Sequence, residues 1–319
     1  MPRRVVATDP GDLPRPAVAA LRARGVSVDV LPAGLDPVVA ADLARDAAVI
    51  LCGIVAMPEA AIARLRSVRL IMRCGAGVDS VDVTAAAQRG IWVANVPDYC
   101  LDEVADHTLL LLLAATRHLS ELQAQLKADR WLNLELPAIR RSRGQTLGLI
   151  GSGRIGQRVA ARAQAFGLEV IVHDPFLTLE RAVQLDVRLV GLDELLATSD
   201  IISLHVPLTA ATHHLLDDAA FGRMRPGVVL VNTSRGALVD LDALQRAMEA
   251  GIVAAAGLDV VDGEPHPDLA HPVLQMPGVI VTPHVAYYSI DSQLDLGRRV
   301  ADEVQRALAG LPPTTLVDP

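Results

Sequence analysis

Three polar side chains suited to acid–base chemistry on an anionic carbonyl compound occur in the second half of the chain. Arg235 lies in VNTSRGALVD, Glu264 in GLDVVDGEP and His284 in VIVTPHVAYYS. Each lies at or just beyond the end of a predicted strand, and ligands of open α/β sheets bind at the carboxyl ends of the strands. We therefore expect these three residues to form one site.

Charge and geometry suggest a role for each residue. The fixed fork of donors on Arg235 suits a carboxylate and the neighbouring keto oxygen. His284 can donate a proton to that oxygen as a hydride reaches the carbon, and remove it in the reverse direction. Glu264 can orient the imidazole and favour its protonated form. Taken singly, each has an ordinary explanation: a solvated Arg, a turn Glu before Pro, or a packed or capping His.

The segment LIGSGRIG at 149–156 provides a place for a redox cofactor. It contains Gly151, Gly153 and Gly156 in the order G-x-G-x-x-G, between a predicted strand at 147–150 and a predicted helix. In this setting the glycines permit a tight turn, close approach of a pyrophosphate and packing of helix on strand. The N-terminus of the helix then offers N–H groups to the phosphates.

An acidic residue completes the dinucleotide pattern. Asp174 ends the next predicted strand, 23 residues after Gly151. Its carboxylate can accept hydrogen bonds from a ribose 2′-hydroxyl and would repel a 2′-phosphate. Because DPFLTLE contains no Arg or Lys, the sequence favours NAD over NADP. The alternative is a glycine-rich strand–helix turn beside a surface Asp.

The elements that must position these residues alternate along the whole chain. Short β-rich segments separated by helical segments predict parallel sheets covered by helices. We expect strands at 4–9, 27–31, 47–53, 69–74 and 91–96, and then at 146–151, 168–174, 200–206, 227–233, 253–260 and 278–284. A long helix is expected from about 101 to 119, and another from Ser289. The simplest architecture is α/β, with two Rossmann-like or flavodoxin-like parallel-sheet domains and a cleft between them.

Composition excludes several other classes of protein. The 319 residues suffice for two domains with a large core. A net charge of −8 without a long basic run argues against direct nucleic-acid binding. The apolar run at 108–116 is too short to span a membrane. The three cysteines are too few and too scattered for a disulfide framework, so we expect a reducing cytoplasm. They form no C-x-x-C pair, so we expect no metal site.

With these motifs in view, the sequence resembles the D-isomer-specific 2-hydroxyacid dehydrogenase family over nearly its whole length. Four blocks match in order: GLIGSGRIGQRVAARAQAFGLEVIVHDP, MRPGVVLVNTSRGALVDLDALQRAMEAG, GLDVVDGEP and VTPHVAYYS. The resemblance implies a substrate-binding domain of residues 1–98 plus 287–319 and an inserted NAD-binding Rossmann domain of residues 99–286. It implies an active site in the cleft between them, with Arg235, Glu264 and His284 as the catalytic residues.

Within the family, NVPDYCLDEVADHTLLLLLAATRHL and PHVAYYS resemble the branch of the C-terminal-binding proteins, which are dehydrogenase-like transcriptional corepressors. Arg73 in MRCGAGVDSVD matches an Arg of that branch, and the family binds the substrate carboxylate through main-chain N–H groups in the loop that follows. Tyr287 stands where the corepressors often have Trp. The implied substrate-binding residues are Arg73, Gly75, Ala76, Gly77, Cys52, Gly53 and Tyr287.

The resemblance also implies cofactor contacts and a homodimer. Besides the glycines and Asp174, the implied cofactor-binding residues are Arg154, Ile155, Val206, Pro207, Thr212, Thr233, Ser234 and Asp259. Val104 replaces a Thr that often contacts the cofactor. The family's dimer arm corresponds to about 100–145 and contains Trp131. The alternative for Trp131 is burial inside one subunit.

Two classes of function follow. The first is an NAD-dependent oxidoreductase that interconverts a small 2-keto acid and its D-2-hydroxy acid. The second is an NAD(H)-sensing, corepressor-like binding protein with little turnover. Glyoxylate, hydroxypyruvate, a larger keto acid and a phosphonate such as phosphonopyruvate all remain open as substrates, the last because Arg73 adds a positive charge. The physiological direction and the acceptance of NADP also remain open.

Overall fold

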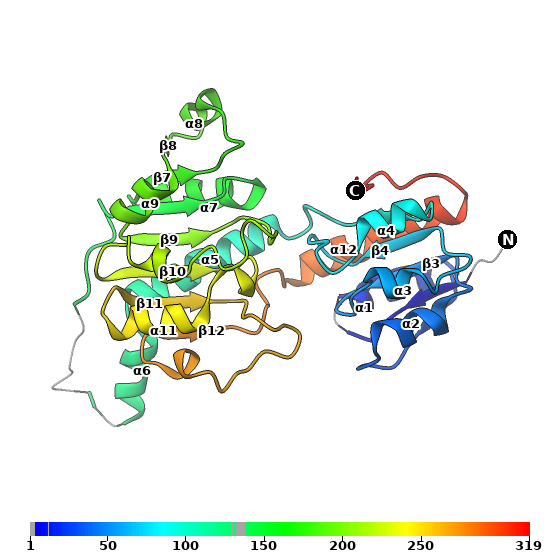
Figure 1. The fold of residues 1–319 in the computed structure, drawn as a ribbon, viewed down its shortest axis with the longest axis horizontal. Helices are drawn as coiled ribbons and strands as arrows, with labels where there is room; N and C mark the ends of the chain where they lie inside the picture. Colours follow the sequence, from blue (N-terminus) through cyan, green and yellow to red (C-terminus); the bar gives the residue numbers. More distant parts are fainter. Residues whose placement is uncertain (1–3, 12, 129, 132–137) are drawn as a thin grey trace. The chain divides into compact units, whose positions relative to one another are not determined.

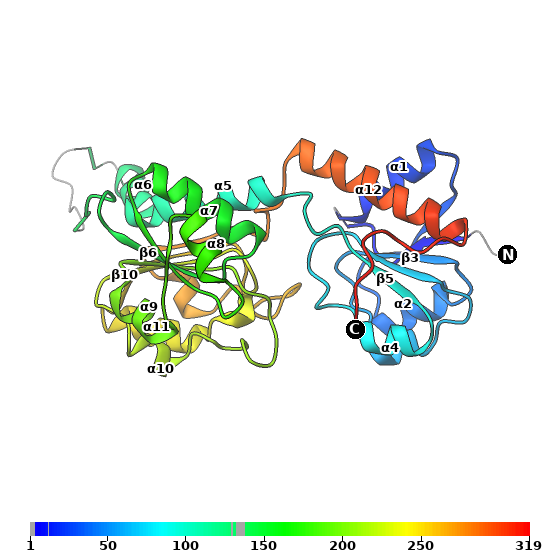
Figure 2. The ribbon, with the colours of Figure 1, turned by 90° about the horizontal axis from the view of Figure 1, so that it is seen from above.

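The computed structural model describes residues 4–11, 13–128, 130–131 and 138–319. The chain forms two compact units, one made of Met1–Cys100 with Tyr288–Pro319 and the other of Leu101–Tyr287. Each unit has its own parallel sheet with helices on both faces (Figures 1 and 2). The prediction of an α/β protein with two parallel-sheet domains is confirmed. We call the two units the terminal unit and the central unit.

The sheet of the terminal unit has five strands in the order β2-β1-β3-β4-β5. Its strands are β1 (Val5–Ala7), β2 (Val28–Val30), β3 (Val49–Cys52), β4 (Leu70–Arg73) and β5 (Trp92–Ala94). The chain builds outward from β1 to β2 and then returns to the other side of β1 with β3. The loops after β1 and β3 therefore diverge at the point where a parallel sheet of this kind binds ligands.

Five helices cover this sheet. On one face, α1 (Pro14–Ala23) packs against α12 (Ile290–Leu308), so that the two ends of the chain share one unit. The opposite face carries α2 (Pro37–Ala44), α3 (Glu59–Ile62) and α4 (Val83–Gln88). Asp36 caps α2 and Asp82 caps α4, while Ser289 begins α12 with a capping box.

The sheet of the central unit has seven strands in the order β12-β11-β10-β9-β6-β7-β8. Its strands are β6 (Thr146–Ile150), β7 (Glu169–His173), β8 (Arg188–Leu189), β9 (Ile201–Leu204), β10 (Val228–Asn232), β11 (Val253–Leu258) and β12 (Val279–Val281). All but β8 fall inside the predicted strands; β8 has only two residues, too few for a periodic pattern. The strand order reverses between β6 and β9. The glycine motif at 151–156 follows β6 at this point of the sheet.

Helices lie on both faces of this sheet as well. The long α5 (Leu101–Thr116) packs on α7 (Arg154–Ala165) and leads into α6 (Leu119–Lys127). The other face carries α9 (Leu192–Thr198), α10 (Asp218–Phe221) and α11 (Leu241–Glu249). The remaining elements are α8 (Leu179–Gln184), which contacts β8, and the short 3-10 helices η1 (Gly236–Leu238) and η2 (Pro272–Gln275).

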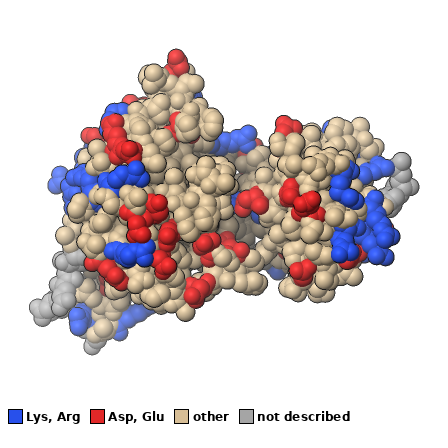
Figure 3. All heavy atoms as spheres, viewed as in Figure 1, with Lys and Arg blue, Asp and Glu red and all other residues tan. Residues whose placement is uncertain are grey.

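Aliphatic side chains fill both cores, as expected for a chain with 3% aromatic residues. The α5–α7 face is packed largely with Ala, Val and Leu side chains, and the opposite face adds the fully buried Phe221. On the face drawn in Figure 3, acidic and basic side chains are intermixed over the central unit. No helix among the described residues is long and apolar enough to cross a membrane.

Candidate active site

The glycine motif forms the turn from β6 into α7 and leaves room for a ligand. A Cβ on Gly151, whose φ is +96°, would lie 2.6 Å from the carbonyl oxygen of His205, and one on Gly156 would lie 2.5 Å from that of Gly151. A Cβ on Gly153 would instead enter open space. Gly153 is the N-cap of α7 and offers no side-chain cap. The turn therefore keeps the start of α7 open toward solvent, as a pyrophosphate requires.

Asp174 lies directly after β7 and holds the glycine loop in place. Its Oδ2 accepts a hydrogen bond from the Ser152 N–H at 2.7 Å, and its Oδ1 accepts one from the Phe176 N–H at 2.9 Å. Each carboxylate oxygen retains a lone pair that can accept from a ribose hydroxyl. The open space above Gly153, the uncapped helix and this acid together fit a dinucleotide such as NAD.

The other predicted cofactor residues lie along the same carboxyl edge of the sheet. The Thr212 hydroxyl donates to the Pro207 carbonyl at 2.7 Å and the Ser234 hydroxyl to the Leu204 carbonyl at 2.8 Å. The Thr233 hydroxyl lies 2.8 Å from that of Thr108, a buried residue of α5. Arg154 and Ile155 begin α7, and Val206 follows β9.

One residue at this edge was missed by sequence reasoning. His205 follows β9, and its carbonyl oxygen is the atom that excludes a side chain at Gly151. Burial lowers the pKa of His205 to about 4, so the imidazole is neutral near pH 7. Its Nε2 lies 2.9 Å from the Ser203 hydroxyl.

Arg235 is held in a turn that the preceding strand anchors. Asn232, the buried last residue of β10, donates from Nδ2 to the Arg235 carbonyl at 2.8 Å and accepts from the Ser234 N–H at 3.0 Å. A Cβ on Gly236 would lie 2.0 Å from the Val261 carbonyl carbon. Only glycine therefore lets the Arg235 turn approach the backbone that leads to Glu264.

Glu264 and His284 form a direct pair. His284 Nδ1 lies 2.5 Å from Glu264 Oε2, and Glu264 Oε1 accepts a hydrogen bond from the Val261 N–H at 3.0 Å. Burial raises the pKa of Glu264, but the hydrogen bond and charge of His284, the Val261 N–H and the charge of Arg235 together hold this pKa below its ordinary value. Since Nδ1 is engaged, Nε2 is the nitrogen available to a substrate. The three residues predicted to meet do lie together.

Asp259 and Tyr287 flank His284. Asp259 follows β11 and is almost fully buried, while its carboxylate accepts hydrogen bonds from the N–H groups of Val285 and Ala286, both at 2.9 Å. The Tyr287 ring stands edge-on to the imidazole, with ring centroids 6.3 Å apart. Asp259 therefore fixes the backbone of the His284 loop.

In the terminal unit, Arg73 is the last residue of β4. It lies next to the loop predicted to bind the substrate carboxylate, residues 75–77, which we call the anion loop. Its Nη1 donates to the Cys74 carbonyl at 2.6 Å, and its Nε is buried without a hydrogen-bond partner. Gly75 has a φ of +155°, and a Cβ there would lie 2.5 Å from Arg73 Nη1. Glycine at this position thus allows the guanidinium to lie against the loop.

The structure does not support three of the predicted substrate contacts. The Gly75 N–H already donates to the Arg73 carbonyl at 2.9 Å, which leaves Ala76 and Gly77 as the donors of that loop. The Gly53 N–H donates to Asp9 Oδ2 at 3.2 Å. Cys52 is completely buried, and burial raises the pKa of its thiol to about 12. Sequence spacing could not show that these groups have partners inside the fold.

Two polar residues that brace these loops were also missed. Asp9 lies after β1, at the point between β1 and β3 where the strand order reverses, and an acidic residue at the end of a predicted strand was the available signal. It also accepts hydrogen bonds from the N–H groups of Gly11 and Ile54. Asn95 donates to the Ala76 carbonyl at 2.6 Å and so supports the anion loop.

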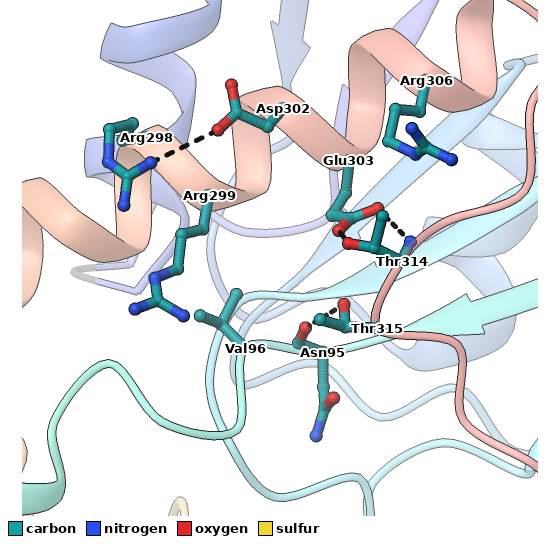
Figure 4. Close-up of a pocket in the computed structure, with 9 residues that line it drawn as sticks. All are labelled: Asn95, Val96, Arg298, Arg299, Asp302, Glu303, Arg306, Thr314 and Thr315. Atoms are coloured by element: carbon teal, nitrogen blue, oxygen red, sulfur yellow. Dashed lines mark hydrogen bonds and ion pairs between the residues drawn. The ribbon is translucent and has the colours of Figure 1, made fainter.

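A pocket of about 260 Å³ lies on the terminal unit, lined by α12, the end of β5 and the C-terminal tail (Figure 4). Its charged residues pair within the unit: Arg298 with Asp295 and Asp302, and Arg299 with Asp98 and Asp295. Glu303 is buried and accepts from both the N–H and the hydroxyl of Thr314. The contacts of Glu303 with Thr314 join α12 to the tail, and the pocket shares no residue with the predicted sites.

Comparison with known proteins identifies the family. Residues 109–286 match the model of the D-isomer specific 2-hydroxyacid dehydrogenase, NAD binding domain. A D-3-phosphoglycerate dehydrogenase of Archaeoglobus fulgidus is 41% identical over 247 residues, which are 77% of this chain and 46% of that protein. The chain thus spans about half the length of the curated relatives it matches. These relatives are phosphoglycerate dehydrogenases, so the expected link to the C-terminal-binding proteins is not supported.

Solved structures extend the match to the whole chain. A glyoxylate reductase from Paecilomyes thermophila is 30% identical with a TM-score of 0.86, covering 99% of this chain and 98% of that one. A D-lactate dehydrogenase from Aquifex aeolicus, crystallised with NAD and lactic acid, is 28% identical with a TM-score of 0.85 and covers 96% of each chain. The chain belongs to the D-isomer-specific 2-hydroxyacid dehydrogenase family and carries that family's NAD-binding domain.

Proposed function

We propose that the protein is an NAD-dependent oxidoreductase that interconverts a D-2-hydroxy acid and the corresponding 2-keto acid. The observation that carries this proposal is the pair formed by His284 Nδ1 and Glu264 Oε2 at 2.5 Å, next to Arg235. This pair lies on the sheet whose carboxyl edge also carries the glycine loop and Asp174. A proton-transfer group and a dinucleotide site are the two requirements for removing a hydride from a hydroxy acid.

The proposed mechanism assigns one task to each residue. Arg235 binds the substrate carboxylate and polarises the oxygen on the adjacent carbon. In the oxidative direction, His284 Nε2 takes the hydroxyl proton while the C2–H bond breaks with its electron pair and the C2–O bond becomes a carbonyl. Glu264 stabilises the imidazolium that this transfer creates. The glycine loop and Asp174 would hold NAD, which when bound would supply the hydride acceptor. In the reverse direction, His284 returns the proton to the keto oxygen.

For the substrate, we propose a 2-hydroxy acid with a second anionic group, of which 3-phosphoglycerate is the first candidate. The support is the buried, unpartnered Nε of Arg73, whose guanidinium lies against Gly75 in the loop that also offers the Ala76 and Gly77 N–H groups. The phosphoglycerate dehydrogenases among the relatives add to this support. The terminal unit would then be the substrate-binding domain. Lactate and glyoxylate, on which similar enzymes act, and a phosphonate such as phosphonopyruvate are the competing substrates.

Two further features belong to this proposal. Asp174 favours NAD over NADP because it would repel a 2′-phosphate. We also propose a homodimer through α5, α6 and the residues that follow, because this part of the chain carries exposed apolar side chains on described residues. These are Leu110, Leu119, Leu126 and Trp131, exposed by 56%, 45%, 53% and 78%. Residues 129 and 132–137 of the predicted dimer arm lie outside the described part of the chain.

The test is an assay of a panel of 2-keto and 2-hydroxy acids that follows NADH absorbance, run on the wild type, His284→Ala and Arg73→Ala. We expect His284→Ala to lower kcat by roughly 10²–10⁴-fold with NADH affinity nearly unchanged. Arg73→Ala should raise KM more for phosphorylated than for singly charged substrates. His271→Ala is the control, because His271 is another His paired with a carboxylate, at 3.2 Å from Asp242, and neither residue belongs to the proposed acid–base site.

Three results would contradict the proposal. Full turnover by His284→Ala would remove the acid–base assignment. Equal catalytic efficiency of Arg73→Ala and the wild type on both substrate classes would remove the anion assignment. Absence of turnover on the entire panel, with NADH-dependent capture of a partner protein, would favour the alternative of a cofactor-sensing binding protein.

A further inference from the structure

Asp259 makes most of the hydrogen bonds that hold the backbone around His284, whose N–H also donates to the Thr282 carbonyl at 2.9 Å. Asp259 takes the N–H groups of three consecutive residues: its carbonyl accepts from His284 at 2.7 Å, Oδ1 from Val285 at 2.9 Å and Oδ2 from Ala286 at 2.9 Å. His284 has a φ of +51°, which is uncommon for a residue other than glycine. Surrounding contacts must hold a residue in such a conformation. The position of the His284 side chain therefore depends on how firmly Asp259 is fixed.

A second chain of contacts reaches Asp259 from α5. The Thr282 hydroxyl donates to Asp259 Oδ1 at 2.6 Å. His107 Nε2 lies 3.0 Å from the Thr282 hydroxyl and 3.5 Å from Asp259 Oδ1. His107 is largely buried and lies 175 residues before Thr282 in the sequence. The mechanism proposed above uses neither His107 nor Thr282.

The proton inventory determines the direction of these bonds. A threonine hydroxyl has one hydrogen, and at Thr282 it is used on the Asp259 carboxylate. Toward His107 the hydroxyl oxygen can only accept, so His107 must carry a hydrogen on Nε2. The chain therefore runs from His107 Nε2–H to Thr282 O–H to the Asp259 carboxylate. Such chains of hydrogen bonds polarise and strengthen one another.

We propose that His107 and Thr282 are positioning residues for His284 that act through Asp259. They fix the side chain of Asp259, which then holds the His284–Ala286 backbone and aims the imidazole at the reacting oxygen. This inference rests on the proposed function, because it takes His284 as the proton-transfer group. Loss of either positioning residue should lower kcat, because a misplacement of about 1 Å at a reacting group can cost about 10²-fold in rate.

The first experiment compares Thr282→Val, which removes the hydroxyl, with Thr282→Ser, which keeps it. We expect Thr282→Val to lower kcat about 10- to 100-fold with the Kd for NADH, measured by fluorescence, within twofold of the wild type. Thr282→Ser should recover most of the rate. The control is Thr116→Val on α5, where the lost hydroxyl is also buried but bonds only helix carbonyls. The proposal would be overturned if kcat fell no more in Thr282→Val than in Thr116→Val. It would also be overturned if Thr282→Val weakened only the binding of NADH.

The second experiment does not depend on turnover. The side-chain ¹⁵N spectrum of the intact chain should show His107 with its hydrogen on Nε2, and the His284 imidazole signals should shift in Thr282→Val but not in Thr282→Ser. We call the hydrogen-bond chain from His107 through Thr282 to Asp259 the relay. A hydrogen on Nδ1 of His107 instead, or unchanged His284 signals in Thr282→Val, would show that this relay does not position His284, even in an active enzyme. If the wild type turns over no acid, the proposed function fails, and these spectra still decide whether the relay exists.

Discussion

Glu264 shows at the scale of one residue how the fold sets an ionisation state. Burial alone would raise its pKa, but the hydrogen bond from His284 and the positive charges of His284 and Arg235 lower it by more. The same contacts that hold the pKa below its ordinary value hold the carboxylate against the imidazole. Glu264 is predicted to orient His284 and to favour its protonated form. That task requires an ionised carboxylate that is held against the imidazole.

The lowered pKa of Glu264 predicts a pH dependence of stability. A carboxyl whose pKa is lower in the folded chain stabilises the fold fully above its ordinary value of 4.5, and this contribution is lost as the pH falls through the folded value. The free energy of unfolding of the wild type, measured with urea, should therefore fall progressively below about pH 4.5. Glu264→Gln should show a shallower decline over the same range. Parallel declines of the two proteins would show that the pair with His284 adds no stability.

Residue types and their spacing predicted much of the candidate site. The motif and the carboxylate pointed to Gly151, Gly153 and Asp174 as cofactor residues. Strand ends pointed to Arg235 and His284 as catalytic residues, and these roles stay predictions. The hydrogen-bond partners could not be predicted in this way. The Gly75 N–H and Cys52 were expected to contact a substrate, yet the first donates to Arg73 and the second is completely buried. Whether a polar group is already satisfied depends on neighbours that the local sequence does not name.

At the scale of elements, periodicity located nearly every strand and both long helices. Alternation of short apolar runs with helical segments is a strong signal in parallel sheets, because their strands are buried on both faces. The two-residue β8 lies below the length at which a period can be recognised. Periodicity could not give the packing partner of α12 either. The family resemblance implied only that the last helix belongs to the same domain as the N-terminal part of the chain.

Close packing of α12 on α1 predicts a selective destabilisation. A Cβ on Gly297 would lie 2.7 Å from the Pro16 carbonyl oxygen, so Gly297→Val forces the two helices apart. We expect a loss of about 1–3 kcal/mol in the free energy of unfolding, as is typical of overpacking. Because the residues of the candidate dinucleotide site lie in the central unit, NADH affinity should remain unchanged.

Calorimetry and an NADH titration check this expectation. Leu294→Val is the matched control, because it introduces the same residue into α12 where the side chain is 68% exposed. Equal stability of the two variants would mean that the α1–α12 contact adjusts without cost. A matching loss of NADH affinity would mean that α12 supports both units.

At the scale of the whole molecule, the proposed homodimer predicts the mass of the protein in solution. Sedimentation equilibrium of the wild type should give about twice the chain mass of 33.8 kDa. Leu126→Asp, at a position 53% exposed on α6, should shift the equilibrium toward the monomer because a charge would be buried in an apolar interface. The control is Leu43→Asp on α2, which is 49% exposed. A monomeric wild type, or equal behaviour of the two variants, would contradict the proposed interface.

Short segments of the sequence were enough to predict the α/β class and the family, and they pointed to the dinucleotide motif with its acid and to the three residues proposed for acid–base chemistry. Each of these is written in a short segment, where period, spacing and residue type carry the information. The tertiary structure alone decided the strand orders and which N–H groups already have partners. It also brings His107 within hydrogen-bond distance of Thr282, and Asn95 within hydrogen-bond distance of the Ala76 carbonyl. Those contacts join residues as far apart as His107 and Thr282, 175 positions, so they exist only once the sheets have formed.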